Sequence, residues 1–147
     1  MEEILYVGFK GKYNSSSKLV DLLQGEKLYL TNSFQGLRKD IDVLEKSYDR
    51  ILMFGLDKNL KEEIKFEKIA QRDGVQIQTM VEIDTYIELA KLNGIECKVS
   101  DKATAYLCND AYYHMMRKME CPVLFVHIPT LKNMSDIFLD KLVGVFA

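Results

Sequence analysis

Cysteine and long apolar runs are both scarce in this sequence. Its 147 residues include three cysteines, Cys97, Cys108 and Cys121, an odd number without the short paired spacing of metal sites. We therefore expect neither a disulfide framework nor a metal site. No apolar run approaches the roughly 18 residues that cross a bilayer, and the chain starts with a methionine and two glutamates, unlike the basic start of a signal peptide. These features predict a cytoplasmic protein without a membrane partner.

A strong charge of one sign is also missing. The formal net charge is −2, which gives no argument for a nucleic-acid partner. No glycine-rich phosphate loop follows the first apolar segment, because Gly8-Phe9-Lys10-Gly11 has neither Walker nor dinucleotide spacing. We expect no cofactor.

The composition is that of an ordinary globular protein, with 48% hydrophobic and 29% charged residues. A chain of this length can bury roughly 70% of its unfolded surface, enough for one core. No internal repeat, low-complexity segment or linker divides it. We expect one domain over residues 1–147.

Strand-like and helix-like patterns alternate along the chain. The expected strands are Glu3–Phe9, Lys27–Leu30, Arg50–Gly55, Ile64–Ala70, Ile95–Val99 and Val123–Ile128. The expected helices are Ser15–Leu23, Ser33–Ser47, Val81–Leu92, Ala105–Met119 and Ser135–Phe146. This order predicts an α/β fold, a three-layer α/β/α domain with a mostly parallel central sheet.

Two segments carry candidate chemistry. Cys108 stands where a helical pattern starts, shortly after a strand that ends near Val99, and His127 lies near the end of the last apolar strand, before Pro129. The carboxyl ends of strands in an open α/β sheet are where sites are built. The ordinary alternative for a cysteine is a buried structural thiol, and we expect that role for Cys97 and Cys121. We expect His114, in the middle of a helix, to have a packing or surface role.

The two segments resemble a known family. Tyr106-Leu107-Cys108-Asn109, followed later by Val126-His127-Ile128-Pro129, resembles the pyroglutamyl peptidase I family, also called pyrrolidone carboxyl peptidases. Members are cysteine peptidases with a Glu, Cys and His triad in that chain order. Phe66-Glu67-Lys68-Ile69-Ala70 resembles the family's Glu-Arg-Val-Ala segment. Weaker landmarks are Ile4–Phe9, Asn14-Ser15-Ser16 and Ile51–Gly55.

The resemblance implies a catalytic role for three residues. Cys108 would be the nucleophile, His127 would carry the proton, and Glu67 would orient the imidazole. In a different register, Glu62 or Glu63 would serve as the acid. Helix N–H groups near the cysteine would hold the oxyanion, and the helix dipole would favour a thiolate.

The resemblance also implies a substrate pocket, in which the chain departs from the family. Phe9 matches the first aromatic that packs on the lactam ring, Asn14 matches the asparagine of the first loop, and Tyr106 matches the aromatic before the cysteine. The second family aromatic is absent, with Tyr13 a candidate replacement. A family segment between the acid and the cysteine is missing, and a glycine before the cysteine is lost at Ala103-Thr104-Ala105.

These features predict a cysteine peptidase that removes N-terminal pyroglutamate from peptides. One alternative is a thiol amidohydrolase for another small amide. Another is a homologue with the same fold, a binding or regulatory role and little turnover. Family members are often homo-oligomers, so the resemblance implies an oligomer here.

Overall fold

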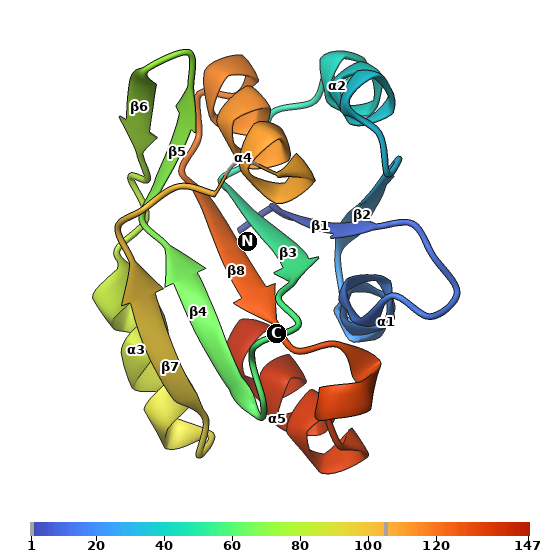
Figure 1. Cartoon of the computed structure of the whole chain (residues 1–147), viewed down its shortest axis with the longest axis vertical. Coiled ribbons are helices and arrows are strands. Elements are labelled where there is room, and N and C mark those ends of the chain that lie inside the picture. Colours follow the sequence, from blue (N-terminus) through green and yellow to red (C-terminus); the bar gives the residue numbers. More distant parts are fainter. Residues whose placement is uncertain (1, 105) are drawn as a thin grey trace.

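A six-stranded sheet forms the centre of the molecule (Figure 1). The structure is a computed structural model and describes residues 2–104 and 106–147. The sheet has the order β2-β1-β3-β8-β4-β7. Its strands are β1 (Ile4–Phe9), β2 (Glu26–Leu30), β3 (Arg50–Leu56), β4 (Glu63–Glu67), β7 (Glu96–Ser100) and β8 (Val123–Ile128).

The sheet is mostly parallel, as predicted. β1, β2, β3 and β8 run in one direction, and β4 and β7 run in the other. The reversal follows from the short connection at residues 57–62, which turns the chain back after β3 without a crossover helix. β8 later takes the place between β3 and β4. The segments on either side of β8 are therefore far from it in sequence.

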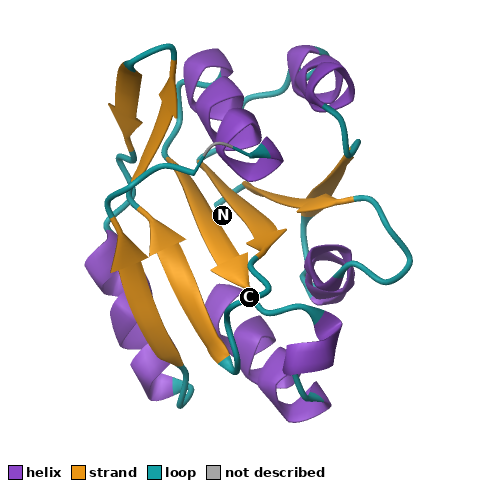
Figure 2. Ribbon diagram, viewed as in Figure 1, coloured by secondary structure: helices purple, strands orange, loops and turns teal. Residues whose placement is uncertain are grey.

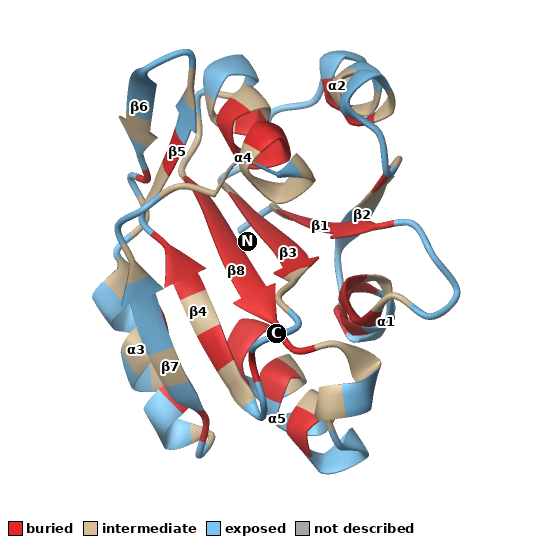
Figure 3. Cartoon of the chain, in the orientation of Figure 1, coloured by how far each residue is buried: buried red, intermediate tan, exposed pale blue. Residues whose placement is uncertain are grey.

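Helices cover both faces of the sheet (Figure 2). One hydrophobic cluster joins one face to α1 (Ser15–Leu22), α3 (Ile83–Leu92) and α5 (Asp136–Phe146). A second cluster joins the opposite face to α2 (Phe34–Asp42) and α4 (Leu107–Lys118). The central strands are buried between these layers (Figure 3). The predicted three-layer α/β/α architecture is confirmed.

The predicted strand Ile64–Ala70 was too long. The pairing with β8 ends at Glu67, and β5 (Ile69–Arg72) pairs instead with β6 (Val75–Gln78) in a separate hairpin. Asp73 and Gly74 make its two-residue turn with φ values of 51° and 78°. An Asp-Gly pair favours that turn because both positions need positive φ.

Several helix boundaries also differ, most by one or two residues, as in α3, which begins at Ile83 rather than at the predicted Val81. α2 ends at Asp42 rather than at the predicted Ser47. α4 begins at Leu107, while Ala105, the predicted first residue, lies outside the described residues. A short 3₁₀ helix, η1 (Leu131–Asn133), precedes α5.

Candidate active site

His127 and Glu67 meet across the β4–β8 pair. Nδ1 of His127 lies 2.8 Å from Oε2 of Glu67, and both side chains are buried. In the antiparallel register Glu67 pairs with Phe125, so the acid and the imidazole are diagonal neighbours on one face. Phe66 belongs to the cluster on the opposite face, as the alternation predicts.

The two alternative acids lie elsewhere. Glu62 accepts a hydrogen bond from Ser135, and Glu63 pairs with Lys98. Among these three glutamates, Glu67 is the one that the structure brings to His127.

Cys108 reaches the same place from α4. It is the second residue of that helix, and its sulfur rests on the backbone of β3: a Cβ added to Gly55 would lie 2.7 Å from the Cys108 sulfur. Gly55 is the register partner of His127 on the neighbouring strand. Parallel strands lie about 4.8 Å apart, and Cys108 and His127 line the same small cavity. A glycine is required here because any side chain would occupy the place of the thiol.

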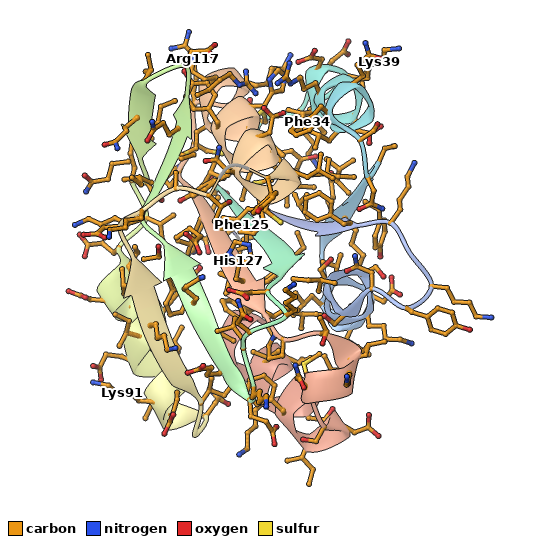
Figure 4. The ribbon with its side chains drawn as sticks, viewed as in Figure 1. Phe34, Lys39, Lys91, Arg117, Phe125 and His127 are labelled. Atoms are coloured by element: carbon orange, nitrogen blue, oxygen red, sulfur yellow. The ribbon has the colours of Figure 1, made fainter. Side chains whose placement is uncertain are left out.

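The walls of the site are aromatic. The Phe125 ring lies 4.9 Å from the His127 ring and 5.6 Å from the Tyr112 ring, measured between centroids. The Tyr112 hydroxyl donates a 2.8 Å hydrogen bond to the backbone carbonyl of Glu67. Figure 4 labels Phe125 and His127, which both project from β8. These contacts fix the backbone that carries the acid.

The Cys108 thiol is held in its neutral form. The pKa of this thiol is raised to about 12: burial makes the largest contribution, the charges of the Glu67 and Asp57 carboxylates add to it, and a backbone hydrogen bond from Leu56 opposes them. This upward shift of the thiol pKa is opposite to the downward shift that the helix dipole alone would cause. Burial and two carboxylates outweigh the dipole because removing a thiolate from water is costly.

A charged pair adjoins the acid, and sequence reasoning missed it. Nζ of Lys65 lies 2.8 Å from Oδ2 of Asp57 and 3.9 Å from Oε2 of Glu67. Burial alone would raise the pKa of the Asp57 carboxyl, but hydrogen bonds from Lys65 and the Asn59 backbone lower it below its ordinary value. The period of a strand places Lys65 on the same face as Glu67, which is the signal that could have revealed it.

The space at the sulfur is small, and a larger groove adjoins it. The cavity lined by Cys108, His127 and Glu67 measures about 10 Å³, room for about one water molecule. A groove of about 360 Å³ shares Thr104 and Asn109 with this cavity. That volume is in the range of small-ligand sites.

The three predicted substrate-binding residues lie in different places. Phe9 is 4% exposed and packs in the same hydrophobic cluster as Cys108. Asn14 caps α1, and its side chain accepts hydrogen bonds from the backbone and the hydroxyl of Ser16. Tyr106 is 76% exposed and lines the groove. Tyr13 is also 76% exposed.

The other two cysteines line neither the cavity nor the groove. Cys97 and Cys121 are free and partly buried, each against one of the hydrophobic clusters. Within residues 2–104 and 106–147, no group of three or more His, Cys, Asp or Glu side chains could hold a metal. In the same part of the chain, no helix is long and apolar enough to span a membrane.

The fold is that of known peptidases. No protein-family model matches the chain, and no curated protein matches it. Among solved structures, pyrrolidone carboxyl peptidase from Thermus thermophilus is similar with a TM-score of 0.81 and 20% identity, covering 97% of each chain. The enzyme from Fervidobacterium islandicum gives 0.80 and 21%, covering 99% of this chain and 95% of the other. Pyroglutamyl peptidase I from Bacillus amyloliquefaciens gives 0.80 and 21%, covering 99% and 91%. The fold implied by the sequence resemblance is confirmed.

Proposed function

Because the chain has the pyroglutamyl peptidase fold, we propose that it is a cysteine peptidase that removes N-terminal pyroglutamate from peptides. The observation that carries the proposal is the meeting of Cys108, His127 and Glu67 at one cavity, with 2.8 Å between the imidazole and the carboxylate. The structures with this fold are pyrrolidone carboxyl peptidases by name.

His127 has the role of proton carrier. Its Nδ1 faces Glu67, so that nitrogen carries the proton and Nε2 is left as the base. Because the Cys108 pKa is high, the thiol gives its proton to Nε2 as the sulfur attacks the carbonyl carbon of the pyroglutamyl peptide bond. Glu67 stabilises the imidazolium that forms.

The start of α4 supplies the oxyanion donors. Among the residues that the structure describes, the backbone N–H of Asp110 is the first in α4 to find an acceptor at the helix start, the Tyr106 carbonyl. The N–H groups before it, including that of Cys108, have no acceptor within the helix. They can hold the negative oxygen of the tetrahedral intermediate. The imidazolium then protonates the leaving amine, which leaves a thioester that water hydrolyses with His127 as the base.

The substrate reaches the sulfur from the groove. A five-membered lactam does not fit the one-water cavity, so the ring must displace side chains or the loop between the cavity and the groove. The groove offers two aromatic side chains, Phe34 and Tyr106. The peptide chain of the substrate has room beside them.

The test is the release of a fluorescent amine from a pyroglutamyl amide, with prolyl and alanyl amides for comparison. Turnover of the pyroglutamyl amide alone, lost in Cys108→Ser and retained in the matched control Cys121→Ser, is the expected result. Turnover that is retained in Cys108→Ser would exclude a mechanism with Cys108 as the nucleophile.

One observation favours a second candidate, a homologue of the same fold with a binding or regulatory role. The sulfur is neutral and faces a space for about one water. Binding of pyroglutamyl peptides without turnover of any amide would select this candidate. Turnover of a different small amide would select the amidohydrolase alternative.

Three further expectations stay predictions. They are a single domain over residues 1–147, a cytoplasmic location and a homo-oligomeric state. Gel filtration with light scattering measures the last of these.

A further inference from the structure

The charges beside the triad form a row. Asp57, Lys65, Glu67 and His127 follow one another with contacts of 2.8 Å, 3.9 Å and 2.8 Å. Nζ of Lys65 and Nδ1 of His127 both lie near the same oxygen, Oε2 of Glu67. Side chains along this row are largely removed from water, with 23% exposure for Lys65 and 18% for Asp57.

The backbone brings these charges together from two strands and a loop. Lys65 is the register partner of His127 in the antiparallel pair, so its side chain rises from β4 beside the imidazole. The backbone N–H of Asp57 bonds to the carbonyl of Ile128, the residue after His127. The Asp57 carboxylate also accepts from the Asn59 backbone, which fixes its direction.

We propose that Lys65 and Asp57 are positioning residues, a paired charge that keeps the Glu67 carboxylate directed at His127. The inference rests on the proposed function. Without Lys65, the Asp57 charge would be uncompensated beside Glu67 in a partly desolvated site, and the repulsion would turn the Glu67 carboxylate away from His127. Without Asp57, the ammonium would turn to Glu67 and compete with His127 for the same oxygen.

Few other charges face the imidazole. From β4 come Glu67 and Lys65, from the β3–β4 connection comes Asp57, and from α4 come the neutral Cys108 and Tyr112. β3 brings Gly55, the register partner of His127. The buried carboxylate of α4, Asp110, is bound to Arg38 and Arg72. Changes at Lys65 and Asp57 therefore act on His127 through a small set of charges.

The proposal predicts the state of the hydrogen bond between His127 and Glu67 in each variant. While Glu67 accepts the Nδ1 proton of His127, that proton exchanges slowly with water and gives a downfield signal in the NMR spectrum. Lys65→Met and Asp57→Asn should each lose this signal, because Glu67 is then repelled by Asp57 or held by Lys65. The double variant removes both charges and should regain the signal, and Lys65→Arg should keep it.

The experiment has two references, a control variant and a second histidine. Lys68→Met removes the same charge from the exposed, opposite face of the chain just after β4, and it leaves the Nδ1 signal of His127 unchanged. His114 binds Asp42 at the far side of α4 and serves as the internal reference in every spectrum. Circular dichroism at the measurement temperature checks that each variant is folded.

The outcome separates this inference from the proposed function. Loss of the Nδ1 signal in both single variants and its return in the double variant support the paired charge, whether or not a pyroglutamyl amide is turned over. With turnover, kcat falls in the same two variants and recovers in the double variant, because a misdirected Glu67 no longer orients the imidazole. A signal that persists in either single variant, or stays lost in the double variant, overturns the inference even in an active enzyme.

Discussion

A single methyl group added at Gly55 should push the Cys108 sulfur away from β3. In Gly55→Ala the new Cβ would lie 2.7 Å from the Cys108 sulfur and 2.6 Å from the nearest carbon of the Phe125 ring. Ordinary contacts are about 3.5–4.0 Å, so one partner must yield by about 1 Å. The Phe125 ring is buried between the rings of His127 and Tyr112 and cannot swing aside. We expect Cys108 and the first turn of α4 to move instead.

The cost has a structural and a catalytic part. Overpacking a buried site lowers the free energy of unfolding by about 1–3 kcal/mol, which urea denaturation measures. A displacement of about 1 Å at a reacting atom lowers turnover of the pyroglutamyl amide roughly 100-fold.

A matched variant adds the same methyl group far from the site. Gly25→Ala places a Cβ 3.0 Å from the Tyr6 ring at a position with a φ of 147°. It lies just before β2, at the end of the sheet opposite the candidate site, so stability should fall while turnover is retained. Wild-type stability and turnover in Gly55→Ala would refute the placement of the thiol against β3.

Two other variants test the charges of the molecule. Glu67→Gln keeps the shape of the side chain but no longer stabilises the imidazolium, so kcat should fall roughly 100-fold or more while KM changes little; an unchanged kcat would exclude Glu67 as the acid. Burial would raise the pKa of the Asp110 carboxyl, but hydrogen bonds and charge from Arg38 and Arg72 lower it below its ordinary value of 3.8. The stabilisation from this network is therefore complete above about pH 4 and is lost as the pH falls through the lowered pKa. Asp110→Asn should cost about 2–3 kcal/mol at pH 7 and flatten the fall in stability below pH 4 in urea titrations; an unaltered acid profile would contradict this.

The fold could be predicted from the sequence because the signals for strands and helices are local. Alternation and helical spacing depend only on residues that are close in the sequence. They predicted the strands of the main sheet and the helices that cover it, with small errors at their ends. The failure at Ile64–Ala70 had a tertiary cause, since the pairing with β8 ends at Glu67 and the chain from Ile69 onward pairs with β6 instead. The Asp-Gly turn that makes this pairing possible was visible in the sequence.

Only part of the candidate site could be predicted from the sequence. The motif around Cys108 and the segments of His127 and Glu67 were enough to name the three residues, but 60 positions separate the imidazole from its carboxylate. Their contact exists because β8 enters the sheet between β3 and β4, and that order is a property of the whole packed core. The same insertion sets Lys65 opposite His127.

Composition and pattern thus determined by themselves which residues form strands and helices and which side chains could do chemistry. Tertiary structure alone decided how much water each of those side chains keeps. It buried the Cys108 sulfur against Gly55, which raised its pKa, and it left room for about one water where a lactam would bind. Desolvation depends on every group packed around an atom, and these groups come from segments that only the folded chain brings together.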